Sequence, residues 1–173
     1  MQTPIVREER PGDEAAIRDV NRAAFETDVE AGLVDALRQT CPERLSLVAL
    51  RGGDVVGHIL FTPATVHAGT REVRGMGLAP MAVLPAHQRA GIGSALVRVG
   101  IERVRAAGCP FVIVLGHPEY YPRFGFERAS AWGLTCEYEG VPDEAFMIVV
   151  FDPGAMRGCS GVARYRPEFA AAM

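Results

Sequence analysis

The sequence lacks several features that would point to common classes of protein. Its apolar runs are far shorter than the ~20 residues that span a bilayer. Its first residues lead directly into Arg7-Glu8-Glu9-Arg10, which is not a secretory signal pattern. It has only four cysteines, and no two of them form a Cys-x-x-Cys pair. We therefore expect a reduced, cytoplasmic protein without a membrane segment, a zinc knuckle or a thioredoxin-like redox motif.

The sequence also lacks a large excess of positive or of negative residues. Eighteen Lys and Arg residues stand against 21 Asp and Glu residues, which gives a formal net charge of −3. This balance argues against general binding to nucleic-acid phosphates. The four histidines have no ligand-like spacing, so no metal site is predicted. With 49% hydrophobic and 23% charged residues, the composition is typical of a globular chain, and we expect residues 1–173 to form a single domain.

The hydrophobic pattern predicts helices bracketed by strands, which is typical of a mixed α/β sheet. One helix is predicted after the cap Gly12-Asp13, with apolar residues from Ala16 to Phe25 on one side. Others are predicted over about 29–39 and 91–107, with a shorter one beginning at Pro118. Strands are predicted over 4–8, 45–50, 55–61, 73–83, 111–115, 126–137 and 145–151. We expect about six to seven strands in the sheet, with Gly75 and Gly77 bending or weakening one of them. The last residues, 170–173, are expected to fray.

The most informative segment is 78–93, where a predicted strand ends at Val83 and two glycines open the longest helix. The first amides of a helix are unpaired and carry a partial positive charge, so they bind anions. Gly91 and Gly93 would let a phosphate approach the backbone, and Arg89 could donate a charged hydrogen bond. A Walker loop is absent, and Leu96 stands where a Rossmann fingerprint needs its third glycine. A packing or capping role is the alternative interpretation of the two glycines.

Two motifs resemble those of the GCN5-related N-acetyltransferase (GNAT) superfamily. The string Gln88-Arg89-Ala90-Gly91-Ile92-Gly93 matches its [RQ]-x-x-G-x-[GA] signature. Downstream, Tyr121 stands four residues before Gly125-Phe126 and follows the apolar run 111–115, an arrangement that many members share. Two such motifs in this order are much more specific than either alone. Together with Gly57-His58-Ile59-Leu60-Phe61, they are most similar to an uncharacterised bacterial branch of predicted N-acetyltransferases.

The resemblance implies a GNAT fold whose mixed sheet is splayed between its fourth and fifth strands. It also implies acetyl-CoA as the cosubstrate and no metal. The pyrophosphate would bind the amides of the glycine motif, and the pantetheine arm would pair with the backbone of the preceding strand. The cofactor-binding residues that follow from this are Met81, Ala82, Val83, Arg89, Ala90, Gly91, Ile92, Gly93 and Ser94.

The implied reaction is direct transfer of an acetyl group from the thioester to a primary amine. Tyr121 would be the general acid that protonates the departing CoA thiolate. Tyr121 acting only as a packing anchor, or Tyr120 acting as the acid instead, are the alternatives. The chain departs from the family pattern at Val114, where many relatives have an asparagine. It also has no acidic residue within 78–83, where several relatives keep a glutamate base. The general base therefore remains unassigned.

Five residues are candidates for that base or for contacting the acceptor: His58, His117, Glu26, Glu30 and Glu119. We expect His58 to be a structural histidine within a strand, and the two glutamates near position 28 to be a solvated helix end. The acceptor would be a small-molecule or peptide amine, and a homodimer is compatible with the resemblance. The alternative functions are a catalytically silent CoA-binding sensor and an acyltransferase that uses another acyl-CoA.

Overall fold

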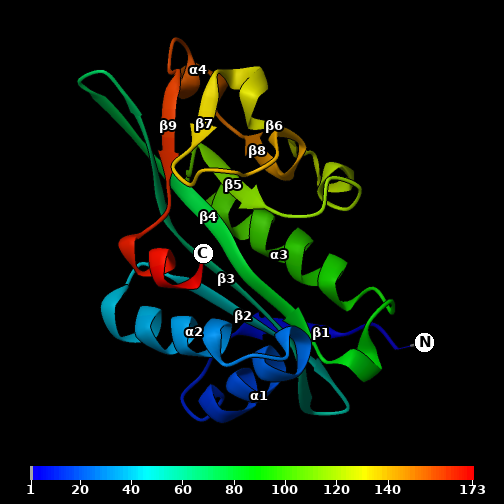
Figure 1. The fold of residues 1–173 in the computed structure, drawn as a ribbon. Coiled ribbons are helices and arrows are strands. Elements are labelled where there is room, and N and C mark those ends of the chain that lie inside the picture. The colour runs from blue at the N-terminus through cyan, green and yellow to red at the C-terminus, as the bar shows by residue number, and fades with distance from the viewer. Residues whose placement is uncertain (1) are drawn as a thin grey trace. The chain divides into compact units, whose positions relative to one another are not determined.

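The computed structural model describes residues 2–173, which divide into two compact units. Unit 1 contains the chain up to Phe61, then Ala79–Gly100 and Glu168–Ala172. Unit 2 contains Thr62–Leu78 and Ile101–Pro167. Two strands and one α-helix contribute to both units, and they are labelled in Figure 1. They are strand β3 (Asp54–Ala68), strand β4 (Arg71–Val83) and helix α3 (Ile92–Ala106).

Unit 1 is built on a short antiparallel meander. Strand β1 (Ile5–Glu8) pairs with β2 (Leu45–Arg51), and β2 pairs with the first half of β3. Helices α1 (Glu14–Phe25) and α2 (Val29–Thr40) lie side by side (Figure 1) and bury their apolar stripes. Fully buried members of these stripes are Ile17 and Leu37. The hairpin and both helices were predicted from hydrophobic spacing and from Gly52-Gly53.

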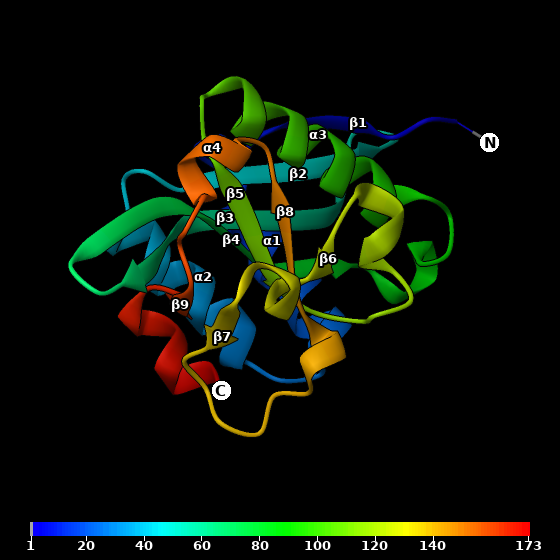
Figure 2. The ribbon, with the colours of Figure 1, turned by 90° about the horizontal axis from the view of Figure 1, so that it is seen from above.

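Unit 2 is organised around β5 (Phe111–Leu115), whose first four residues are buried. Strand β5 pairs in parallel with β4 over Met76–Leu78 and antiparallel with β8 (Phe146–Val150). Figure 2 shows β5 and β8 running beside one another. Strand β6 (Glu127–Arg128) pairs with β8, while β9 (Gly161–Arg164) pairs with β3 and, in parallel, with β7 (Leu134–Cys136). Helix α4 (Pro153–Met156) precedes β9.

The fold class is confirmed, but the strand count was too low. The described residues form a mixed, mostly antiparallel sheet of nine strands, in the order β1-β2-β3-β4-β5-β8-β6, with β9 joining β3 and β7 joining β9. Strand β9 was missed because its short run, Gly161–Arg164, has no strong alternation. The predicted splay beside β4 stays a prediction, as does the single domain.

Three local predictions were wrong for identifiable reasons. Residues 126–137 are not one strand, because a 3₁₀ turn at Ala129–Trp132 ends in left-handed Gly133 (φ 71°) and separates β6 from β7. The helix predicted from Pro118 is a 3₁₀ turn over Tyr121–Phe124. The chain end is not frayed, since Pro167–Ala172 forms another 3₁₀ helix.

The sequence predicted that Gly75 and Gly77 bend or weaken their strand, but β4 is continuous through both. A β-carbon at residue 75 would lie 2.7 Å from the ring of Phe111, and one at residue 77 would lie 2.5 Å from the ring of Tyr165. The absent side chains make room for these buried aromatic rings, so both glycines are packing positions within an unbroken strand.

Candidate active site

The glycine motif follows β4 through a loop that its own hydrogen bonds anchor. The Leu84 amide donates to the Val56 carbonyl at 2.9 Å, and the Gln88 side-chain amide donates to the Val83 carbonyl at 3.0 Å. A 3₁₀ turn over Pro85–His87 lies between these two contacts. The loop is therefore tied back to the strands that precede it, which sets the direction in which the chain enters α3.

Helix α3 begins at Ile92, directly after Gly91. The Ala95 amide donates to the Gly91 carbonyl at 3.0 Å, so the amides before Ala95 donate no bond within the helix ladder itself. Gly91 is exposed at φ 81°, and a β-carbon there would meet nothing within 4 Å. Arg89 is exposed and also left-handed, at φ 61°. The helix start therefore has an open side with donor groups, which suits an anion.

Packing under this helix start depends on Gly57, for which the sequence predicted no packing role. A β-carbon at Gly57 in β3 would lie 2.9 Å from Ile92 Cγ2 and 3.1 Å from Leu96 Cδ1. The side chains of Ile92 and Leu96 are fully buried, whereas Gly91, which directly precedes the helix, is exposed. Gly57 thus lets the first turn of α3 pack closely on the strand. Its only signal in the sequence was a glycine within an otherwise apolar strand.

The predicted cofactor-binding residues, Met81–Val83 and Arg89–Ser94, all lie in unit 1. Tyr121 lies in unit 2, at the first position of its 3₁₀ turn, and is 6% exposed. Its ring packs against the backbone of Gly116 and makes edge contacts with Tyr120 and Phe126 at centroid distances of 5.1 and 5.5 Å. Burial, with a smaller contribution from Tyr120, raises the pKa of the Tyr121 phenol. The phenol therefore keeps its proton at neutral pH.

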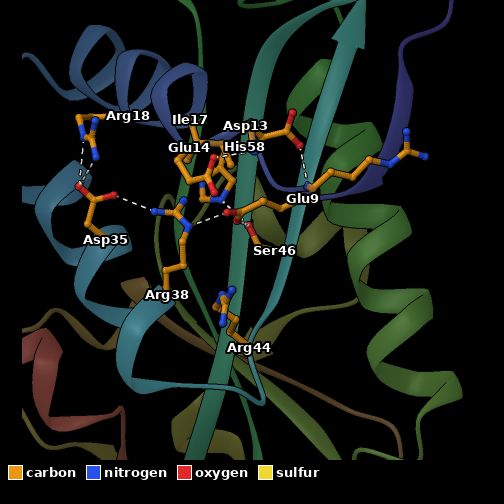
Figure 3. Close-up of polar contacts among 12 residues, drawn as sticks. Glu9, Asp13, Glu14, Ile17, Arg18, Asp35, Arg38, Arg44, Ser46 and His58 are labelled. Carbon is orange, nitrogen blue, oxygen red and sulfur yellow. Dashed lines mark hydrogen bonds and ion pairs between the residues drawn. The ribbon is translucent and has the colours of Figure 1, made fainter.

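His58 is a structural histidine, as predicted. It is fully buried, and its Nε2 lies 2.9 Å from Ser46 Oγ (Figure 3). Its Nδ1 lies 3.2 Å from the Asn21 side-chain nitrogen. Burial, and then the charge of Arg38, lower the pKa of His58 to about 3. A neutral imidazole whose ring nitrogens are both engaged is poorly suited to serve as the base.

The other candidates for a base or acceptor contact lie mostly on the surface. His117, Glu119 and Glu26 are exposed, and the half-buried Glu30 accepts a hydrogen bond from Thr27 at 2.8 Å. Nearby, Asp28 pairs with Arg22 at 2.5 Å. These acids fit the expected solvated helix end, and none has a geometry that assigns it a catalytic role.

None of the four cysteines forms a disulfide, and burial raises the pKa of the Cys109 thiol, in keeping with the inert core thiol predicted there. Within residues 2–173, no group of three or more His, Cys, Asp or Glu side chains could hold a metal ion. No helix in this range is both long and apolar enough to cross a membrane.

Comparison with known proteins places these features in one family. Residues 6–129 match the sequence model of the acetyltransferase (GNAT) domain. The chain is 47% identical over 135 residues, 76% of its length and 74% of the relative's, to the uncharacterized N-acetyltransferase YjhQ of Escherichia coli K12. It is 34% identical over 166 residues, 95% of its length and 98% of the relative's, to the uncharacterized N-acetyltransferase YhbS of the same strain.

Two solved structures are similar over nearly the whole chain. Crystalline YhbS from E. coli in complex with CoA has a TM-score of 0.88 and 33% identity, covering 96% of this chain and 92% of that one. A GNAT acetyltransferase from Brucella melitensis in complex with acetyl-CoA has a TM-score of 0.78 and 36% identity, covering 98% and 99%. The glycine motif, the fold and these relatives agree, and the chain belongs to the GNAT family of N-acetyltransferases.

Proposed function

We propose that this protein transfers the acetyl group of acetyl-CoA directly to a primary amine on a small molecule or peptide. The open start of α3 beside exposed Gly91 is the observation that carries the proposal, because the first amides of a helix lie outside its own hydrogen-bond ladder and face a space that can admit a pyrophosphate. Two relatives that are more than 30% identical bind CoA or acetyl-CoA in crystals. We further propose that the chain acts as one domain in the cytoplasm, and that it can form a homodimer.

The phosphates would bind the amides of Arg89–Ser94, with the Arg89 guanidinium adding a charged donor. The pantetheine arm would pair with the backbone of Met81–Val83, a mode that depends on main-chain groups and tolerates many side chains. The Gln88 bond to the Val83 carbonyl supports this arrangement, because it ties the strand end to the loop that would hold the phosphates.

In the proposed reaction, the amine loses its ammonium proton to water and its nitrogen attacks the thioester carbonyl carbon. The carbon–sulfur bond then breaks, the acylated nitrogen releases its extra proton to water to give the neutral amide, and the CoA thiolate takes a proton from the Tyr121 hydroxyl. A proton from solvent restores the phenol. The buried, protonated state of Tyr121 supports this role, since a general acid must hold its proton before the transfer.

Tyr121→Phe tests the acid, with Tyr120→Phe as the matched control. We expect Tyr121→Phe to lower kcat by about 10²–10⁴-fold in an amine screen followed by release of free CoA thiol. Binding of CoA should be unchanged, because the hydroxyl acts only in the transfer. Equal kcat for Tyr121→Phe and the parent would reject Tyr121 as the acid. A large loss in Tyr120→Phe alone would assign the role to its neighbour.

Two alternative functions give different results in the same screen. A silent CoA-binding sensor would bind acetyl-CoA without releasing thiol from any amine. An acyltransferase of other specificity would release thiol from a longer acyl-CoA and not from acetyl-CoA.

A further inference from the structure

Unit 1 contains a cavity of about 290 Å³ that is separate from the residues assigned to acetyl-CoA. It is lined by the end of β1, the start of α1, the end of α2 and the start of β2. None of its lining residues belongs to Met81–Val83 or Arg89–Ser94. The polar side chains that matter here are Glu9, Glu14, Arg38, Arg44 and Ser46 (Figure 3). The volume is near the lower end for small-molecule sites.

The Arg38 guanidinium has one buried N–H donor group without an acceptor. Its Nε donates to Glu9 Oε1 at 2.5 Å and its Nη1 donates to Asp35 Oδ1 at 2.8 Å. Its Nη2 is buried and has no hydrogen-bond partner among the described residues. Buried donors are almost always paired, so an unpaired guanidinium nitrogen in the lining of a cavity indicates a site for an acceptor.

Arg44 supplies a second guanidinium in the same lining. Its Nη1 donates to the Cys41 carbonyl at 3.1 Å, and it takes part in no ion pair among residues 2–173. In Figure 3 no dashed line joins it to the other labelled side chains. Two arginines with donors still available are a common way to hold a planar carboxylate, because each guanidinium presents N–H groups in a fixed fork.

Two acidic residues of the lining, Glu9 and Glu14, are engaged elsewhere in the protein. Both oxygens of Glu9 are engaged, one by Arg38 and the other by the Ser46 hydroxyl at 2.5 Å. Glu14 Oε2 accepts from the Gly12 amide at 2.8 Å. Both Glu9 oxygens and one Glu14 oxygen are therefore used within the protein, whereas donors on Arg38 and Arg44 are left over.

We propose that this cavity binds a small molecule through a carboxylate group, with Arg38 Nη2 and the Arg44 guanidinium as its donors. The site is distinct from the acetyl-CoA site and does not depend on the proposed reaction. Glu14, in the same lining, would favour a ligand that also carries an ammonium group.

The test is a titration of the full chain with succinate, glycine or inorganic phosphate, followed by NMR of the arginine Nε–H resonances. We expect saturable shifts of the Arg38 and Arg44 signals with a dissociation constant of about 1 mM or tighter for at least one carboxylate. Tighter binding of glycine than of succinate would identify a zwitterionic ligand, and the reverse would identify a dianion. Either order supports the carboxylate site.

Arg44→Gln should weaken this binding by about tenfold or more, as expected for loss of a charged, forked donor. Arg44→Lys keeps the charge and should restore part of it. Arg157→Gln, an exposed arginine in unit 2, is the control and should bind like the parent. Linear, non-saturating shifts would overturn the proposal, as would equal affinity in Arg44→Gln. Tighter binding of phosphate than of both carboxylates would overturn the assigned ligand class.

Discussion

The ring of Tyr121 occupies the space beside the backbone of Gly116 that any larger residue would need. A β-carbon at position 116 would overlap Tyr121 Cε2 and lie 2.7 Å from its Cδ2. Because Gly116 directly follows β5, the end of that strand holds the proposed acid in place through contact with its ring. The orientation of Tyr121 therefore depends on a residue that carries no chemistry of its own.

Gly116→Ala is expected to displace this ring. The overlap should lower the free energy of unfolding by about 1–3 kcal/mol, as overpacked cores do, and should lower acetyl transfer as well. Urea unfolding and thiol-release rates measure the two effects. Gly32→Ala is the control, since Gly32 lies within α2 with nothing within 4 Å of a new β-carbon. It should raise stability by about 0.5–1 kcal/mol. Unaltered stability and activity in Gly116→Ala would contradict the contact.

Gly91→Ala tests the proposed phosphate site. Alanine at φ 81° should cost about 1–2 kcal/mol of stability, and its methyl group would enter the open space beside the start of α3. We expect CoA to raise Tm less in this variant than in the parent at the same concentration. Gly158→Ala in unit 2 has a similar φ of 69° and open surroundings, so it should show the stability cost alone. Identical CoA affinity in Gly91→Ala and the parent would rule out phosphate binding at this loop.

His58 should make stability fall in mild acid. Its pKa is lowered to about 3 by burial and by Arg38, while the unfolded chain should titrate near 6.5. Between these values the unfolded state binds a proton that the folded state does not, so stability is complete above about pH 6.5 and is lost as pH falls. The slope should approach about 1.4 kcal/mol per pH unit.

The window from about pH 6.5 to 5.5 isolates this effect from Asp13 and Glu14, whose pKa values are lowered by Arg7 and by backbone amides respectively, because the unfolded carboxyls take up protons only near about pH 4. Urea unfolding at several pH values measures the slope, and His58→Gln should make it shallower across the same window. A slope that is the same with and without His58 would show that the imidazole is not neutral in the folded protein.

Ser46 is expected to be structural and not nucleophilic. The Asn21 side-chain amide donates to His58 Nδ1, so Nε2 carries the ring proton and Ser46 Oγ accepts it. The Ser46 hydroxyl in turn donates to Glu9 Oε2, which means that His58 cannot act as its base. A fluorophosphonate probe should therefore leave Ser46 unlabelled.

Ser46→Ala should lower stability by about 2–3 kcal/mol, because it leaves the His58 N–H and a Glu9 oxygen without their partner. Ser160→Ala, at an exposed position, should change stability by less than about 0.5 kcal/mol. Equal stability of the two variants would show that the buried network contributes little.

Local sequence patterns were sufficient for the elements whose hydrophobic period is long and regular. Helices α1, α2 and α3 and strand β5 lie within a residue or two of their predicted bounds, because each buries a stripe or run that a short window of sequence reveals. Segment 126–137 failed because its strands are two and three residues long and exist only through pairing with β8 and β9. Such pairing joins residues that are distant in the chain.

The same division applies to the functional residues. The sequence by itself determined the family, and it is the source of the prediction that the glycine motif and Tyr121 form the site, because all three depend on residue types at short, set spacings. Only the tertiary structure decided that Gly116 and Gly57 hold those elements, and that His58 is closed within a network with Asn21 and Ser46. The cavity beside Arg38 and Arg44 was equally invisible in the sequence. Its lining comes from four elements spread over residues 8–46, and only folding brings their charged groups together and leaves one buried donor unpaired.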